Sequence, residues 1–274
     1  MVMQFEAKGI IVEHLLKDLT IEWVLGVFLV FCRIGSAMVM MPGIGEAFVP
    51  MRIRLCFALM FSLVMLPLLS AVLPHAVPPS AMQLAMWVMA EVLIGLALGA
   101  VARLILSTLH MAGMIIAYQT GLASAMLFDP NSGNQGSVIG NLFTMVGVVL
   151  IFETNAHHLF LRGLAHSYDI FRFGTWLPIT DMSQAVTQLM SHSFMVAMQL
   201  SAPFIVVGIV FFLGCGVLAR LMPNMNIFFV IVPLQVLLGL FILLAMFTAG
   251  MSWYIDSYQD SLHDFLSGTM TVQD

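Results

Sequence analysis

The sequence predicts an all-α membrane protein with six to seven hydrophobic helical segments, several of them broken or kinked. Hydrophobic residues make up 61% of the 274 residues, charged residues make up 8%, and the mean hydropathy is +1.04. Soluble domains carry about 25% charged residues, and a transmembrane helix needs about 20 consecutive apolar residues. The composition therefore predicts one membrane domain and leaves no room for a soluble enzyme domain.

The distribution of polar residues divides the chain into three parts. Residues 1–18 combine charges with apolar residues at helical spacing, which predicts an amphipathic segment at the membrane interface. Residues 19–255 form the predicted single helical membrane domain, and residues 256–274 form an acidic C-terminal tail. The net charge of −5 and the lack of a Lys/Arg cluster argue against nucleic-acid binding.

Within the membrane domain, helix-breaking residues separate the apolar runs. The runs comprise residues 19–41, 55–73, 81–103, 104–120, 138–152, 194–221 and 227–255. Proline lacks a backbone donor and fixes φ, so a break is expected at Pro42-Gly43-Ile44-Gly45 and a kink at Pro67. Residues 153–185 are the most polar part of the domain and predict a short helix and a loop outside the hydrocarbon.

A central loop is predicted at residues 121–137, between two uncharged apolar runs. A run of small residues, then Asp129-Pro130, then a patch of Asn, Ser, Gly and Gln disfavour helix there. Non-helical backbone at membrane depth is tolerated only where it is buried in protein or lines a watery cavity. The pattern therefore indicates a loop inside a membrane assembly, and an ordinary loop at the membrane surface is the alternative.

Five charged residues lie inside the apolar runs, namely Glu22, Arg33, Glu91, Arg103 and Arg220. Each costs about 2.5–3.5 kcal/mol at the bilayer centre on insertion scales, so these side chains are not expected to face lipid. One interpretation is a proton or ion pathway. The interpretation that we favour is that the charges pair with one another or with partner subunits. The three arginines lie near the ends of their runs, where snorkelling lowers the cost.

Glycine spacing predicts close helix packing in two places. Small residues three or four positions apart share one helix face and let another helix approach closely. The two sets are Gly95 with Gly99, and Gly113 with Ala117 and Gly121. Because Glu22, Glu91 and the Gly95/Gly99 face need cover, we expect a stable hetero-complex with other small membrane proteins.

The sequence carries no motif for catalysis or for a cofactor. Glu153, His157 and His158 could offer metal ligands, since positions 153 and 157 share a helical face, but no third ligand stands at a diagnostic spacing. A polar helix end is the favoured interpretation. There is no nucleophile elbow, P-loop or dinucleotide fingerprint. We therefore expect no bound metal, no cofactor and no enzyme activity.

Several short motifs follow one another along residues 20–255. They comprise Arg33, Pro42-Gly43-Ile44-Gly45, Val49-Pro50, Arg54-Leu55, Ala112-Gly113, Gln119-Thr120-Gly121, Asp129-Pro130, the stretch from Glu153 to Leu159, Ser167-Tyr168, the stretch from Arg220 to Phe228 with Pro223 and Asn226, Pro233 and Gly239. In this order and spacing they resemble the FliR family, the flagellar biosynthetic membrane proteins related to the SpaR/YscT proteins of virulence type III secretion. The family usually has Gln where Asn224 stands and Gly where Ala156 stands.

The resemblance implies a non-enzymatic subunit of the type III protein export gate, in the bacterial inner membrane at the flagellar basal body. It implies that FliP and FliQ assemble with the chain into a helical ring and that FlhB associates with this ring. Unfolded flagellar proteins would pass through the ring. Many apolar runs would then form helical hairpins that pack on protein rather than on lipid, with Pro223 and Asn226 among the packing positions. It also implies a plug role for part of the central loop. The plug residues are Gly121, Leu122, Ala123, Ser124, Ala125, Met126, Leu127, Phe128, Asp129 and Pro130.

Two other classes of protein fit part of the pattern. A secondary transporter also uses broken helices around a buried-charge site, but the sequence shows no inverted repeat and its breaks do not match between two halves. An intramembrane metalloenzyme built on Glu153, His157 and His158 is the more distant alternative.

Overall fold

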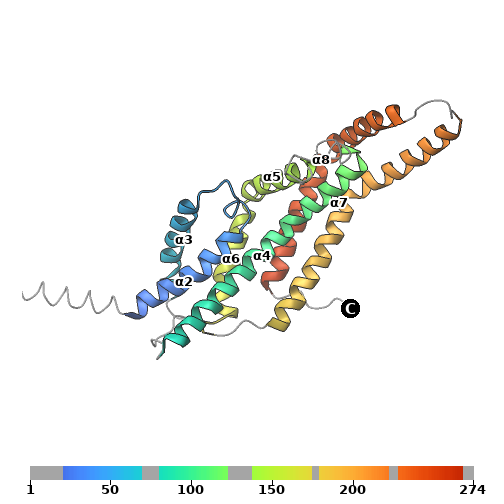
Figure 1. The fold of residues 1–274 in the computed structure, drawn as a ribbon. Coiled ribbons are helices and arrows are strands. Elements are labelled where there is room, and N and C mark those ends of the chain that lie inside the picture. Colours follow the sequence, from blue (N-terminus) through green and yellow to red (C-terminus); the bar gives the residue numbers. More distant parts are fainter. Residues whose placement is uncertain (1–20, 70–79, 123–137, 175–178, 222–227, 268–274) are drawn as a thin grey trace, which may run out of the picture. The chain divides into compact units, whose positions relative to one another are not determined.

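The computed structural model describes residues 21–69, 80–122, 138–174, 179–221 and 228–267, and these are helical with connecting turns (Figure 1). The helices are α2 Ile21–Met40, α3 Met51–Met65, α4 Ala81–Gln119, α5 Val138–Glu153, α6 Ala156–Ile170, α7 Ile179–Leu221 and α8 Phe228–Ser267. Within these ranges, four helices are long and apolar enough to cross a membrane, or five if the bent pair α5–α6 counts as one span. The predicted all-α membrane class is confirmed.

The chain divides into two compact units. Unit 1 holds Met1–Ala102 and Leu161–Met182, and unit 2 holds Arg103–Phe160 and Ser183–Asp274. The boundaries fall inside α4 and α6, so each unit takes one part of these two helices.

Three helices extend further than the apolar runs predicted. Helix α4 passes through Arg103 without a break, because residues 81–119 contain no proline. Helix α7 begins at Ile179 rather than at residue 194, and α8 continues past Ile255 to Ser267. The predicted acidic tail is thus helical as far as Ser267. Its aspartates, Asp256, Asp260 and Asp264, lie on an exposed face.

The signal for the longer α8 is a periodic set of buried residues among the polar ones. Met251, Tyr254, Ile255, Tyr258 and Leu262 are buried at helical spacing. With 39, 43 and 40 residues, α4, α7 and α8 are each about twice as long as the ~20 residues that a bilayer core requires. Each of these helices is therefore longer than a single perpendicular crossing of a bilayer core requires.

In unit 1, the turn between α2 and α3 is held by backbone geometry and by one arginine. Gly43 adopts a φ of 84°, in the left-handed region that favours glycine. Arg54 of α3 donates from Nε to the Ile44 carbonyl at 3.1 Å and from Nη2 to the Glu46 carbonyl at 3.0 Å. At the other end of α3, regular helix stops at Met65, so Pro67 follows the helix instead of kinking it.

The short helix predicted in the polar region is α6, and a sharp bend separates it from α5. The two helices meet at an angle of 73° across Thr154 and Asn155. Asn155 has a φ of 57°, and asparagine tolerates this left-handed conformation better than other residues with a Cβ. The residues at the break therefore end α5 and turn the chain into α6.

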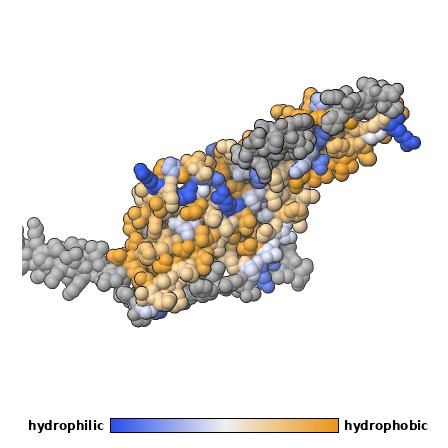
Figure 2. All heavy atoms as spheres, in the orientation of Figure 1, coloured by the Kyte–Doolittle hydropathy of each residue, from blue (hydrophilic) through white to orange (hydrophobic). Residues whose placement is uncertain are grey.

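The surface of the protein is mostly apolar, as Figure 2 shows for one face. In the most apolar window of α4, 56% of the residues are buried inside the chain, whereas the corresponding values are 17% for α7 and 6% for α8. Helix α4 is thus largely covered by its own chain. Helices α7 and α8 leave large apolar side chains uncovered, for lipid or for neighbouring subunits.

Candidate functional site

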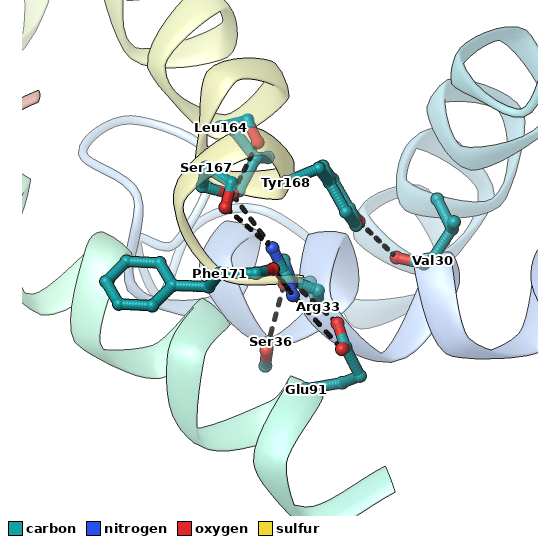
Figure 3. Close-up of polar contacts among 8 residues, drawn as sticks. All are labelled: Val30, Arg33, Ser36, Glu91, Leu164, Ser167, Tyr168 and Phe171. Atoms are coloured by element: carbon teal, nitrogen blue, oxygen red, sulfur yellow. Dashed lines mark hydrogen bonds and ion pairs between the residues drawn. The ribbon is translucent and has the colours of Figure 1, made fainter. Parts of the chain in front are cut away.

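A buried ion pair joins α2 to α4 in unit 1 (Figure 3). The Arg33 guanidinium donates from Nε to Glu91 Oε2 at 2.6 Å and from Nη2 to Glu91 Oε1 at 3.0 Å. The Arg33 side chain is 0% exposed and the Glu91 side chain is 1% exposed. This bidentate geometry is the strongest arrangement available to an arginine and a carboxylate.

The same guanidinium also caps the C-terminal end of α6 (Figure 3). Nη1 donates to the Ser167 carbonyl at 3.1 Å and to Ser167 Oγ at 3.2 Å, and Nη2 donates to the Phe171 carbonyl at 2.8 Å. The C-terminal end of a helix carries partial negative charge that a cation stabilises. The Tyr168 ring adds a cation–π contact, with its centroid 4.0 Å from Arg33 Cζ.

Arg33 thus makes five hydrogen bonds, as many as its N–H groups allow. This arrangement favours pairing within the chain over an ion pathway, because no guanidinium donor remains for a water or an ion. It also corrects one expectation. Arg33 does not snorkel towards the membrane surface but is enclosed by α2, α4 and the C-terminal end of α6.

The Gly95/Gly99 face is covered by the chain's own α2. A Cβ added at Gly95 would collide with the Arg33 carbonyl oxygen and Ser36 Oγ, and one added at Gly99 would lie 2.5 Å from the Ala37 carbonyl oxygen. Close helix packing at this spacing was predicted. However, the expectation that partner proteins cover this face, or cover Glu91, is wrong.

The remaining predicted packing residues fall into two groups. Arg103 on α4 and Arg220 in the last turn of α7 are exposed side chains. The other group lies outside the described residues and comprises the side chain of Glu22, Pro223, Asn226 and the plug residues from Ala123 to Pro130. Of the predicted plug, the structure describes Gly121 and Leu122.

In unit 2, the C-terminal end of α4 contacts both α7 and α8. Gly121 follows α4 with a φ of 74°. Gln235 of α8 donates from Nε2 to the Gln119 carbonyl oxygen at 2.9 Å. A Cβ added at Gly239 of α8 would collide with the Thr120 side chain, and one added at Gly208 of α7 would lie 2.5 Å from Gln119 Oε1.

Gln235 was not singled out from the sequence. Its only signal is that it is a polar residue inside an apolar run, two positions after Pro233. The sequence analysis also missed Tyr254, which is another polar residue in a mostly apolar stretch. Its hydroxyl donates to the Ile105 carbonyl oxygen of α4 at 2.9 Å inside unit 2. Buried polar groups are expected to find such partners, but the sequence does not say which.

Of the predicted small-residue contacts of α4 in unit 2, the one at Gly113 is met by α5. A Cβ added at Gly113 would lie 2.6 Å from the Gly140 backbone nitrogen. Further along, a cavity of about 230 Å³ opens among α4, α5, α7 and α8, and its lining residues are apolar apart from Gln199 and Trp253. No charged side chain lines it among the described residues.

The region around Glu153, His157 and His158, which the sequence analysis weighed as a metal site and did not favour, contains an aromatic stack. The His157 ring lies 4.9 Å from the Phe152 ring and 4.2 Å from the His158 ring, measured between centroids. Among the described residues, no three His, Cys, Asp or Glu side chains converge on one point. That the protein binds no metal stays a prediction.

Comparison with known proteins supplies the family. Residues 24–261 match the sequence model of the family described as "Bacterial export proteins, family 1". The chain is 39% identical over 238 residues to the "Flagellar biosynthetic protein FliR" of Caulobacter vibrioides, an alignment that covers 86% of this chain and 94% of the relative. The protein of the same name from Bacillus subtilis is 28% identical, with 79% and 83% covered.

A relative from a different system aligns with a shorter part of the chain. The "Yop proteins translocation protein T" of Yersinia pestis is 27% identical over 147 residues, which are 53% of this chain and 56% of the relative. The family model, by contrast, spans the residues from α2 into α8. It includes the C-terminal ends of α4 and α6 and the side chains that contact them. The chain therefore belongs to family 1 of the bacterial export proteins.

Proposed function

We propose that this protein is a subunit of the flagellar type III protein export gate, the membrane channel through which unfolded flagellar proteins leave the cell. The observation that carries the proposal is the match to the export family over residues 24–261. The flagellar assignment is supported by coverage, since the relatives named as flagellar proteins align with more of the chain than the Yersinia relative does.

The uncovered faces of α7 and α8 support assembly with other subunits. In unit 2, large side chains such as Phe212, Leu213, Phe241 and Leu244 are exposed, and none of them is polar. We propose that FliP-type and FliQ-type proteins pack on these faces in the bacterial inner membrane at the flagellar basal body, with an FlhB-type protein associated. Membrane lipid covers the rest.

A gate subunit needs no catalytic group, and the charges inside the described helices are consistent with this role. The Arg33–Glu91 pair is satisfied within unit 1. The cavity in unit 2 is lined without charge. A secondary transporter would need a buried-charge site open to a solute, and neither region has that form.

The central loop is proposed as the plug of the resting channel. Its residues Leu122, Met126, Leu127 and Phe128 are apolar, and the small residues among them allow close approach of neighbouring subunits. A hydrophobic constriction blocks ions by excluding water. A passing protein chain then displaces the loop.

The function is tested by deleting the gene from its host and restoring it in tagged form. We expect the deletion strain to lose export of flagellar proteins and motility, and the tagged protein to restore both. Purification in mild detergent should recover FliP-type, FliQ-type and FlhB-type proteins. A tagged protein that purifies alone and moves a solute by itself would support the transporter instead.

The plug is tested by shortening Ala123–Phe128 in the assembled complex. We expect the subunits to co-purify as before while the resting membrane conducts ions, because the water-excluding side chains are gone. Phe128→Ala should leak less than the deletion. Conductance as low as in the unmodified strain, with assembly intact, would contradict the plug.

A further inference from the structure

We infer that the cavity in unit 2 is a phospholipid-binding site, which takes one acyl chain and holds an ammonium headgroup beside its polar end. The cavity measures about 230 Å³ and is lined by α4, α5, α7 and α8. An apolar cavity of about 150 Å³ stays dry and holds benzene, so this cavity has room for a longer hydrocarbon segment. The inference goes beyond the proposed function and does not depend on it.

The walls of the cavity suit a flexible hydrocarbon chain. Its buried side is formed by Ile116 of α4, Phe143 of α5 and Phe204 of α7. Met246 and Met251 of α8 also line it, and flexible thioethers pack well against irregular shapes. A polar solute would lose its hydrogen bonds to water against these walls, which is costly. An acyl chain has no such bonds to lose.

The two ends of the cavity differ in polarity. Helices α7 and α8 run antiparallel along it (Figure 1). Gly250 of α8 lies against Leu200 of α7, since a Cβ at Gly250 would be 3.0 Å from Leu200 Cδ1. Gln199 precedes Leu200 and Trp253 follows Gly250, so both polar residues lie towards the same end of the cavity. Leu243 lies towards the other end, which is apolar.

The polar end offers hydrogen-bond donors to the ester groups of a lipid. The side chains of Gln199 and Trp253 are exposed, although both stand in largely apolar stretches. A glutamine amide and an indole N–H can donate, and an ester carbonyl oxygen accepts. Tryptophan side chains also favour the membrane interface, at the level of the headgroups. An acyl chain that enters the cavity from this end therefore places its ester group beside donors.

Beyond the polar end, α8 carries acidic side chains on the face of Trp253. Asp256 and Asp260 follow Trp253 at helical spacing, so the three residues share one face, and both aspartates are exposed. Charges of this sign repel an anionic headgroup and attract an ammonium group. They therefore favour a phospholipid such as phosphatidylethanolamine over phosphatidylglycerol.

The first test counts the phospholipids that stay bound when the protein is purified with its associated subunits in mild detergent. Ala249 lines the cavity and its side chain is exposed, so Ala249→Trp fills the space without displacing a buried group. We expect native mass spectrometry to show one phospholipid fewer per subunit, with the associated subunits retained. Ala245→Trp is the matched control, because Ala245 is an exposed residue of α8 that is not among the lining residues. The control should keep the lipid.

A second test addresses the polar end. Gln199→Leu and Trp253→Phe each remove a hydrogen-bond donor and keep a large side chain. We expect each to lower the retention of phospholipid about fivefold, in line with the loss of one neutral hydrogen bond.

A third test addresses the headgroup. The probe is a vesicle with equal amounts of phosphatidylethanolamine and phosphatidylglycerol, into which the protein is reconstituted before purification. The bound lipid should be enriched in phosphatidylethanolamine, and Asp256→Asn combined with Asp260→Asn should abolish the enrichment.

The outcomes separate a lipid from other occupants of the cavity. Unchanged phospholipid in Ala249→Trp overturns the site. Loss of an associated subunit from Ala249→Trp, but not from Ala245→Trp, also overturns it, because a side chain of that subunit then fills the cavity. If neither tryptophan variant reaches the membrane, unchanged retention in both Gln199→Leu and Trp253→Phe overturns the site. Equal binding of the two phospholipids by the unmodified protein overturns the assignment of the headgroup.

Discussion

Two helices of this protein end on a side chain from a distant part of the chain, and the two caps differ in strength. In unit 1, Arg33 caps the end of α6 with a charged group that makes five hydrogen bonds, two of them within the ion pair with Glu91. In unit 2, Gln235 caps the end of α4 with one neutral hydrogen bond. The Arg33 contact is therefore costly to break, whereas the Gln235 contact can be broken at a modest cost in free energy.

The two caps differ in free energy because breaking each one leaves different groups without a partner. Separation of Arg33 from Glu91 would leave two charges in an enclosed apolar environment, which is costly. Separation of Gln235 from Gln119 would leave two neutral dipoles, and water can replace either partner once the contact opens. Arg33 therefore couples α2, α4 and the end of α6 strongly in unit 1, whereas in unit 2 the end of α4 is held to α8 by a weaker hydrogen bond.

The largest effect is expected from breaking the charged cap. Arg33→Leu leaves Glu91 buried without its partner and removes the cap of α6, so we expect a loss of about 3–5 kcal/mol in unfolding free energy. Thermal unfolding in detergent, together with the amount of protein in the membrane, measures it. Arg220→Leu is the control, because Arg220 is exposed at the end of α7.

A double variant sharpens this prediction. Arg33→Leu with Glu91→Leu removes both charges, so no charge is left buried without a partner. We expect the double variant to be more stable than Arg33→Leu alone. Equal loss in the single and the double variant would mean that the caps on Ser167 and Phe171, rather than the ion pair, supply the stability.

The second-largest effect concerns the close contact between α4 and α2 at Gly99. Gly99→Leu drives a large side chain into the Ala37 carbonyl and Met40 of α2, and overpacking of this kind costs about 1–3 kcal/mol or more. We expect lower unfolding temperatures and less protein in the membrane. Gly216→Leu is the matched control, because a Cβ at Gly216 meets no atom within 4 Å. A Gly99→Leu protein that folds normally but loses its partners would restore the original expectation of a subunit interface.

Much of the frame could be predicted from the sequence. Apolar run length and composition predict the membrane class, and the glycine spacing at Gly95 and Gly99 predicts close packing. The prediction that a partner protein covers this face was wrong, because the residue pattern of one helix does not indicate which other helix packs on it. The C-terminal end of α8 was predicted too early. Three aspartates make this stretch look like a polar tail, although Tyr254, Tyr258 and Leu262 form a buried face of the helix.

The candidate site could be predicted only in part. Arg33 and Glu91 stand out because charges in apolar runs are expensive, so pairing within the chain was one of the expected outcomes. Gln235 does not stand out, because one uncharged glutamine in an apolar helix does not indicate which group its amide bonds. Its role depends on a contact between residues 116 positions apart, which no local pattern encodes.

The smallest effect tests whether a neutral bond matters because it caps a helix or because it is buried. Tyr254 donates to the Ile105 carbonyl oxygen at 2.9 Å, as Gln235 donates to the Gln119 carbonyl oxygen at the same distance. Ile105 lies in the interior of α4, where the helix itself supplies a partner for the carbonyl. Tyr254→Phe therefore orphans no backbone group, and we expect it to cost about 0.5–1.5 kcal/mol, at the low end of that range. Unfolding temperature measures the cost, and hydrogen exchange at the Thr120 and Gly121 amides should stay as it is. Gln235→Met, which removes the donor to the Gln119 carbonyl, should instead speed exchange at these two amides. Faster exchange at the end of α4 in Tyr254→Phe would show that burial of the bond, and not its position at the helix end, controls that end.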